Sequence, residues 1–181
     1  EAGADATLRA TGGDCKGQTA LEMAEERYHV DVVALLRRST LGVEAQAALD
    51  KQLIDAAEEG DAAAIERLAG EGASPDAKGG FAGSFPAVCR AAEQGHTAAV
   101  EALLRLGADP NATASAGGTA LTTAAKYGHA EIVAALLEGG AAVDTVHGNG
   151  RTALMLAACY GQAECTRLLL EAGADATLRI T

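Results

Sequence analysis

Apolar residues between positions 119 and 151 fall at helical spacing in two short stripes, with a glycine between them and polar residues after them. Thr119 stands just before the first stripe, where its hydroxyl can accept hydrogen bonds from the first amides of a helix. Gly128 ends that helix, because glycine adopts left-handed backbone conformations at little cost. A second helix is predicted from about Ala130 to Gly139. Each helix of about eight to ten residues is too short to be stable alone in water, so it must pack against neighbours.

The same pattern returns along the chain at a fixed step. Residues 124–129 read Ala-Ala-Lys-Tyr-Gly-His and lie 33 residues after a matching phrase at 91–96, and a third copy spans 157–162. Repeats of this length form supersecondary units that cannot bury their apolar faces alone and therefore stack. The sequence thus predicts an all-α array of stacked helix-turn-helix units joined by hairpin loops.

The repeated phrase resembles the signature of the ankyrin repeat family. Residues 117–121 read Gly-Gly-Thr-Ala-Leu, Gly128-His129 follows, and a Leu-Leu pair then precedes Gly139-Gly140-Ala141. The resemblance implies an ankyrin-repeat solenoid of four to five repeats that covers nearly the whole chain. Two features depart from the family pattern: the Pro and His that follow Thr in the family are absent from every copy, and Tyr28 replaces a family glycine. The missing His removes a hydrogen bond that the family uses at this helix start.

The repeats divide the chain into six segments of different character. Residues 49–78 lack the Thr phrase, are acidic and resemble a capping first repeat, although a full-looking repeat precedes them. The predicted segments are a repeat resembling a C-terminal one at 1–38, a linker at 39–48, the capping repeat at 49–78, a repeat with a phenylalanine-containing loop at 79–111, a repeat at 112–144, and a repeat with the start of the next unit at 145–181.

The order of the units leaves three arrangements open. Residues 1–9 and 171–179 are the same nonapeptide, Glu-Ala-Gly-Ala-Asp-Ala-Thr-Leu-Arg, 170 residues apart. In the first arrangement, the chain is one window of a longer array whose higher-order unit has that length. In the second, it is a circular permutant whose first repeat stacks on its last. In the third, it is a plain series whose first repeat stacks on the acidic capping repeat. The neighbour that Leu35 and Leu36 contact distinguishes these arrangements.

The charge of the chain narrows the choice of partner. Net charge is −11, from 25 acidic and 14 basic residues, whereas nucleic-acid binding needs a basic surface. Residues 50–77 alone carry a net charge of −6, which favours a protein partner with a basic surface. The alternative is that these acids only keep the array in solution. No apolar run reaches the roughly 18 residues of a membrane span, so no membrane insertion is expected.

Candidate chemistry is sparse. The four cysteines contain no C-x-x-C pair and indicate neither a zinc site nor a redox motif, and buried thiols are typical of a reducing compartment. We therefore expect an intracellular, cytoplasmic protein. No nucleophile with a base, no phosphate-binding glycine loop and no histidine-rich spacing indicates catalysis. The chain is expected to be no enzyme and to carry neither a metal nor a cofactor.

The resemblance also selects candidate binding residues. In the ankyrin family, partners contact the two residues between Ala-Ala and Gly, together with the hairpin tips before Thr. Tyr127 and Tyr160 then form an aromatic row on adjacent units, beside Lys126, and tyrosine is a frequent hot-spot residue. The alternative is that both rings lie flat on neighbouring helices as ordinary packing. The other positions that this rule selects are Glu93, Gln94, Cys159, Ser115, Asn149 and Arg151.

A glycine-rich loop adds two aromatic candidates. Two extra residues enter the repeat between Gly60 and Gly95, and residues 79–86 contain both phenylalanines of the chain, Phe81 and Phe85. Such a loop suggests a mobile finger that inserts into a partner. The alternative is that the rings are tucked back over the acidic capping repeat.

These observations predict a non-catalytic protein–protein interaction module, a scaffold or adaptor. Its partner would bind the hairpin tips and the concave face of the helices. The alternative is a structural or assembly element whose duplicated ends form head-to-tail contacts. The chain is accordingly expected as a monomer or as a head-to-tail assembly.

Overall fold

Five helical hairpins form the part of the chain that the structure describes. The computed structural model describes residues 19–27, 29–40, 42–79, 85–114 and 117–179. The helices are α1 (Ala20–Glu26), α2 (Val30–Thr40), α3 (Val43–Glu59), α4 (Ala62–Glu71), α5 (Ala87–Gln94), α6 (Thr97–Arg105), α7 (Ala120–Tyr127), α8 (Ala130–Glu138), α9 (Ala153–Cys159) and α10 (Ala163–Glu171). Strands β1 (Lys78–Gly79) and β2 (Phe85–Pro86) form a short antiparallel ribbon. The all-α solenoid that the sequence predicts is confirmed.

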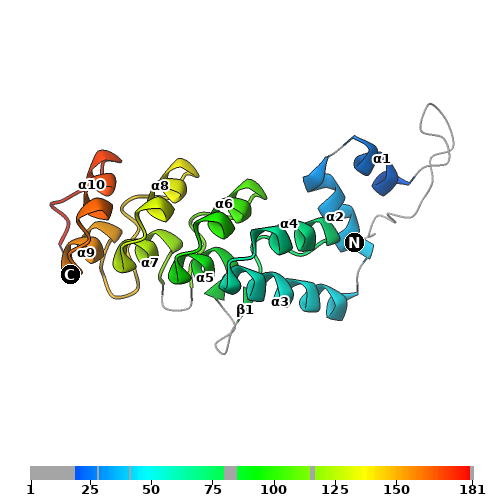
Figure 1. Ribbon diagram of the computed structural model, residues 1–181, viewed down its shortest axis with the longest axis horizontal. Helices are drawn as coiled ribbons and strands as arrows, with labels where there is room; N and C mark the ends of the chain where they lie inside the picture. The colour runs from blue at the N-terminus through cyan, green and yellow to red at the C-terminus, as the bar shows by residue number, and fades with distance from the viewer. Residues whose placement is uncertain (1–18, 28, 41, 80–84, 115–116, 180–181) are drawn as a thin grey trace.

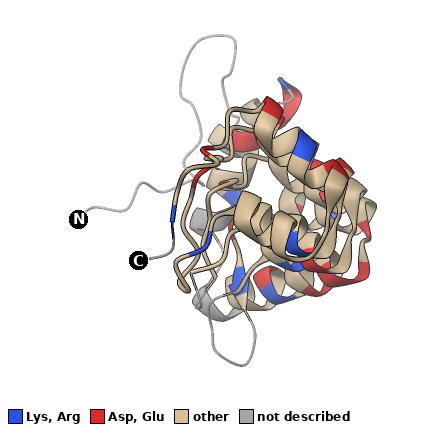
Figure 2. Cartoon of the chain, turned by 90° about the vertical axis from the view of Figure 1, so that its left-hand side faces the viewer, with Lys and Arg blue, Asp and Glu red and all other residues tan. Residues whose placement is uncertain are grey.

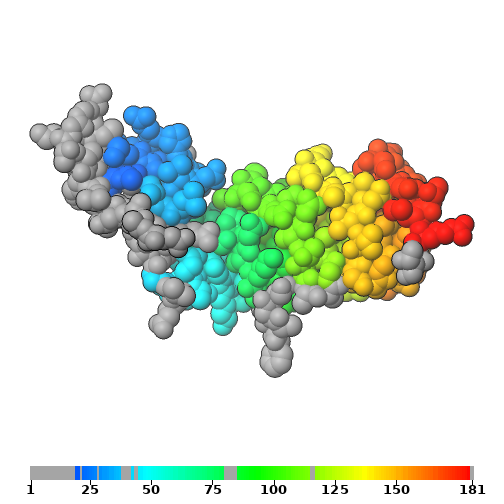
Figure 3. All heavy atoms as spheres, turned by 180° about the vertical axis from the view of Figure 1, so that it is seen from behind, coloured from blue at the N-terminus to red at the C-terminus, as the bar shows by residue number. Residues whose placement is uncertain are grey.

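The hairpins stack in chain order into an elongated body (Figures 1 and 3). The first helices α3, α5, α7 and α9 form one row, in which each contacts the next. The second helices α4, α6, α8 and α10 form a parallel row with the same successive contacts. The described parts of the connecting hairpin loops lie on the side of the first helices. Each inner unit is therefore packed between two neighbours.

A continuous apolar core runs along this stack. On the first helices, small alanine side chains let neighbouring helices pack closely, and Ala91, Ala124 and Ala157 are completely buried. Larger side chains fill the space between the second helices. The completely buried leucines that recur there are Leu103, Leu136 and Leu169. The low aromatic content of the chain is thus compatible with a dense core, since small side chains let neighbouring backbones pack closely.

The unit at 119–139 shows how local residues set the helix ends. The Thr119 hydroxyl accepts a hydrogen bond from the Thr122 amide, at 3.2 Å, as the sequence predicts. In return the Thr119 amide donates to the Thr122 hydroxyl, at 2.9 Å. Thr122 therefore replaces the hydrogen bond of the absent family histidine, and Glu22 does the same for Thr19 in α1. Gly128 ends α7 with a φ of 82°, in the left-handed region.

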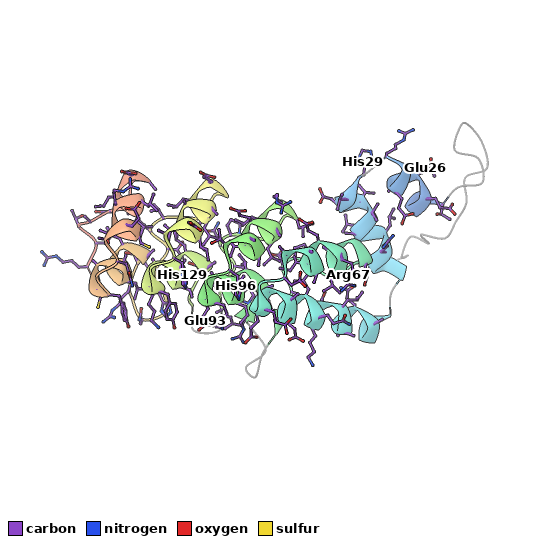
Figure 4. All side chains as sticks on the ribbon, in the orientation of Figure 1. Glu26, His29, Arg67, Glu93, His96 and His129 are labelled. Atoms are coloured by element: carbon purple, nitrogen blue, oxygen red, sulfur yellow. The ribbon has the colours of Figure 1, made fainter. Side chains whose placement is uncertain are left out.

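The Gly-His phrase contributes contacts between consecutive units of the stack. His96 forms no side-chain bond at the start of its own helix, and instead its Nε2 lies 3.0 Å from the Glu58 carbonyl oxygen on α3. Figure 4 shows His96 and His129 at equivalent places in consecutive units. A Cβ at Gly95 would lie 2.7 Å from Cε1 of His129. Glycine therefore leaves room for the imidazole of the following unit.

A second row of hydrogen bonds connects the hairpin loops. The Asp109 amide donates to Asp76, the Ala142 amide to Asn111 and the Asp175 amide to Asp144, at 2.7–3.1 Å. Asn111 also takes part in a local turn, because its amide donates to the Asp109 carboxylate. One loop residue in each unit thus fixes the register of the next.

The N-terminal hairpin meets the stack through α2, which packs on α4. Arg37 donates from Nη1 to the Gly70 carbonyl oxygen, at 2.6 Å. In the rest of the stack both helices of a unit pack on the preceding unit, whereas here it is α2 that makes the contact. Leu35, which was to distinguish the three arrangements, is 65% exposed, and residues 1–9 lie outside the described residues.

The segment expected as a linker, 39–48, is mostly helical. Thr40 is the last residue of α2, and α3 starts at Val43. Residues 43–53 are rich in Ala, Gln, Glu and Leu, which favour helix. The Gln46 side-chain amide donates to Asp50 on the same helix and to the Gly72 carbonyl oxygen beyond α4, so this extension is also held by the hairpin.

Candidate partner-binding groove

A concave groove of about 240 Å³ lies on the side of the first helices. Helices α5, α7 and α9 contribute to it, together with β2 and the hairpin loop at 145–151. Its predicted members are Phe85, Glu93, Lys126, Tyr127, Asn149, Arg151 and Tyr160. The structure thus brings residues from three successive units to one surface. We call this surface the tyrosine groove.

The two tyrosines stand in register at the ends of consecutive helices. Tyr127 is the last residue of α7, and Tyr160 is the C-cap of α9. Tyr127 is 45% exposed and Tyr160 is 52% exposed, so neither ring is buried as core packing would require. The Tyr127 ring stacks on the His129 ring, with centroids 6.2 Å apart. The Tyr127 ring is therefore supported by His129, and about half of the surface of each tyrosine is exposed to solvent.

Lys126 lies between the two rings. Its ammonium nitrogen is 4.7 Å from the centroid of Tyr127 and 5.8 Å from that of Tyr160. It also donates a hydrogen bond to the Tyr127 hydroxyl, at 3.3 Å. Cation–π attraction of this kind stabilises a side chain against a ring at a partly exposed site. The three side chains therefore form one cluster across two units.

The hairpin loop at 145–151 closes one edge of the groove through its own hydrogen bonds. The His147 amide donates to the Arg151 carbonyl oxygen, at 2.7 Å, and the Gly150 amide donates to that of His147, at 2.8 Å. The Asn149 amide donates to Nδ1 of His147, at 3.2 Å. The Arg151 amide donates to the Asn149 side-chain oxygen. The loop is thus a closed turn that holds Asn149 and Arg151 at the groove.

Phe85 closes another edge and is partly buried against the core. The Arg90 guanidinium lies 4.6 Å from the centroid of its ring. Arg90 also pairs with Glu93, at 3.6 Å, and with Glu58 on α3, at 3.8 Å. Phe85 is therefore held against the core beside Arg90 of α5. Phe81 lies outside the described residues.

Two of the other predicted contact residues do not line this groove. Gln94 and Cys159 are exposed but are not part of its lining. Ser115 lies outside the described residues. The family rule selects the two residues between Ala-Ala and Gly in each unit. In each of these pairs, one or both residues line the groove.

Sequence reasoning missed several lining residues, of which Thr123 and Leu156 are the clearest. Thr123 lies four residues before Tyr127, and Leu156 lies four residues before Tyr160. Residues with this spacing share one face of a helix. The positions four residues before each tyrosine could therefore have been predicted as lining residues. His147 also lines the groove, but its place depends on the fold of the hairpin loop and carried no sequence signal.

Two buried thiols lie in the core rather than in the groove. Burial raises the pKa of the Cys89 thiol to about 12, and burial also raises the pKa of Cys165. Both thiols are therefore protonated near neutral pH and are poor nucleophiles. Within the described ranges, no group of three or more His, Cys, Asp or Glu side chains could hold a metal ion. None of the helices described has the length and hydropathy for crossing a bilayer.

Comparisons with known proteins agree with the fold. Residues 88–180, just over half of the chain, match the family model described as ankyrin repeats, in three copies. The comparison with curated proteins found no match. The matched range contains the stacked units that form the tyrosine groove, together with their repeated Thr and Gly-His phrases. The chain belongs to the ankyrin repeat family.

Proposed function

We propose that this chain is a non-catalytic scaffold or adaptor that binds a partner protein on its concave face, through the tyrosine groove and the neighbouring hairpin loops. Ankyrin repeats are generally protein–protein interaction modules. The observation that carries the proposal for this chain is the groove itself. Side chains from α5, α7, α9 and two loops meet there, although each unit contributes only a few of them.

The half-exposed tyrosines support this function. Tyrosine contributes a large contact area at low conformational entropy and keeps a polar tip for hydrogen bonding. Here the scaffold also holds both rings in place, since Lys126 lies near both and His129 stacks on Tyr127. A partner would lose little further entropy in ordering them, which favours tight binding.

The proposal is tested with the double variant Tyr127→Ala and Tyr160→Ala. A partner is first identified by affinity capture from the native cell, and its affinity is then measured with purified proteins. The variant should weaken binding by well over 1 kcal/mol, or about tenfold in Kd. The matched control replaces Glu101 and Glu138, exposed residues of the second-helix row, by alanine. An unchanged affinity in the tyrosine variant would show that the groove is not the binding surface.

The acidic repeat at 49–78 extends the proposal to the charge of the partner. Aspartates and glutamates outnumber lysines and arginines in this repeat. Figure 2 marks the acidic and basic positions of the described chain. We propose that a basic region of the partner faces this repeat. Exposed charges are screened by salt, so the affinity should fall as ionic strength rises. A salt titration in which affinity stays constant would contradict this part of the proposal.

A structural role is the second candidate. Apolar side chains are exposed at both ends of the stack: Val30, Val32 and Leu35 on α2, and Leu170 and Leu178 at and after α10. Such faces could join head to tail and extend into a filament. Light scattering over a range of concentrations tests this, because self-association raises the average mass with concentration and a constant monomer mass contradicts it. From the cysteine pattern of the sequence, we also propose a reducing cytoplasmic location.

A further inference from the structure

The tyrosine groove holds two cations that have no ion-pair partner among the residues that the structure describes. These are Lys126 on α7 and Arg151 in the hairpin loop. Five other arginines of the described chain do pair with carboxylates. They are Arg37, Arg67, Arg90, Arg105 and Arg167. Other described cations, Lys51 among them, also form no ion pair, so what distinguishes Lys126 and Arg151 is that they lie together at one groove.

The acidic residue that lines the groove does not neutralise them. Glu93 contacts Arg90, with 3.6 Å between Oε2 and Nη1, and forms no ion pair with either groove cation. Lys126 and Arg151 are both half-buried, so solvent screens them less than it would a fully exposed side chain. The groove is therefore locally positive, although the net charge of the chain is −11.

The contacts of Lys126 also indicate the sign of the side chain that would bind. The ammonium already occupies the cation–π position near both tyrosine rings, so a second cation at the same rings would be repelled. An ammonium has three donors, and one of them is directed to the Tyr127 hydroxyl. Arg151 offers a planar set of donors that suits a carboxylate.

We propose that the tyrosine groove recognises an Asp or Glu side chain in an extended segment of the partner protein. The carboxylate accepts hydrogen bonds from Lys126 and Arg151, while a neighbouring apolar side chain packs on the rings of Tyr127 and Tyr160. The inference rests on the proposed function, because it names what that same groove recognises. A partner that satisfies both proposals presents an acidic segment to the groove and a basic region to the acidic repeat at 49–78.

Selection from a phage-displayed library of random dodecapeptides tests this. Peptides enriched on the wild-type protein should share an Asp or Glu at one aligned position, next to an apolar residue. The affinity of a synthetic copy should fall about tenfold with Lys126→Gln, and again by a similar factor with Arg151→Gln. Lys51→Gln is the matched control, since it removes one exposed positive charge on α3, outside the groove. Its effect should stay within about twofold.

A double-mutant cycle, which combines a variant of the protein with a variant of the peptide, separates local recognition from a general charge effect. Replacing the shared Glu by Gln in the peptide should remove most of the difference between wild type and Lys126→Gln. Enriched peptides without a shared acid, sensitive to Tyr127→Ala with Tyr160→Ala but not to Lys126→Gln, would overturn this inference and leave the proposed function intact. Peptides indifferent to the tyrosine variant, or no enrichment at all, would overturn both. Circular dichroism of each variant checks that it is folded.

Discussion

The hairpins α1–α2 and α7–α8 begin alike but are buried differently. Thr19 caps α1 and Thr119 caps α7, each in a capping box with the residue three positions later. Val32 on α2 and Ile132 on α8 both follow a histidine by three residues. Val32 is 45% exposed, whereas Ile132 is completely buried. The shared phrase therefore produces the same helix start in both hairpins, but not the same degree of packing.

The difference shows which properties of a repeat are local and which depend on its neighbours. A cap needs only residues three positions apart, so it forms wherever the phrase occurs. Burial of the second helix needs a unit on each side. Helix α8 contacts both α6 and α10, while α2 contacts α4. In a stacked array, stability is approximately the sum of such unit and interface terms, so α1–α2 should be the weaker of the two hairpins.

The largest expected effect comes from Leu136→Ala in α8. Leu136 is completely buried, so its truncation leaves a cavity and should lower the free energy of unfolding by about 2–5 kcal/mol. The matched variant in the weaker hairpin is Leu36→Ala, because Leu36 follows His29 by seven residues as Leu136 follows His129. Leu36 is only partly buried, so its truncation should cost clearly less than that of Leu136. Urea denaturation followed by circular dichroism measures both. Equal losses would mean that the two hairpins are equally well packed.

A smaller loss is expected from Gly128→Ala. Gly128 has a φ of 82°, and a Cβ there would collide with the side-chain amide of Gln162 in the next unit. Such left-handed strain at a non-glycine residue costs about 1–3 kcal/mol. The position also bears on the comparison of the two hairpins, because the sequence of α1–α2 has Tyr28 where α7–α8 has Gly128. Adding Gln162→Ala should recover the part of the loss that is due to the collision; no recovery would mean that backbone strain accounts for all of it.

The positions of the helix ends could be predicted because they depend on neighbouring residues in the sequence. Thr119, Gly128 and Ala130 set the limits of α7 and the start of α8 where the pattern places them. The repeat period does not predict the helical extension of α3, although its residues individually favour helix. Gln46 bonds the Gly72 carbonyl oxygen, a residue far along the chain, and the repeat period gives no information on such a contact. The bond from His96 to the preceding unit escaped prediction for the same reason.

The candidate site was predictable as far as the repeat register extends. Tyr127 and Tyr160 occupy equivalent positions in stacked units, so the period alone places them side by side. His147 also lines the groove, but its place depends on hydrogen bonds within the hairpin loop, which the repeat register does not predict. Whether Lys126 forms an ion pair depends on which carboxylates the fold brings near it. The spacing of residues in the sequence does not predict those neighbours.

Removing the caps should cost about 1 kcal/mol in either hairpin. Thr119→Ala breaks the bond to the Thr122 amide in a unit that is packed on both sides. Its effect should therefore spread, as faster amide hydrogen exchange, to the neighbouring units. Thr19→Ala breaks the equivalent bond to Glu22, and faster exchange should be confined to α1 and α2. Hydrogen exchange read by mass spectrometry measures both patterns. Spreading from Thr19→Ala would show that α1–α2 is coupled to the stack as strongly as α7–α8.

The smallest effect concerns the contact between the weaker hairpin and the stack. Arg37 donates from Nη1 to the Gly70 carbonyl oxygen and from Nη2 to the Glu25 carboxylate, so its planar guanidinium links α2 to α4 and α1 at once. Arg37→Lys keeps the charge but replaces this fork by a single ammonium, and about 0.5–1 kcal/mol of the docking free energy should be lost. Exchange should become faster in α2 and stay unchanged in α8. Arg67→Lys is the control, because Arg67 forms an exposed pair with Glu71 on its own helix and its replacement should have no measurable effect. If Arg37→Lys also changes nothing, then apolar contacts between α2 and α4 hold the hairpin, and the exposure of Val32 does not reflect a weak attachment.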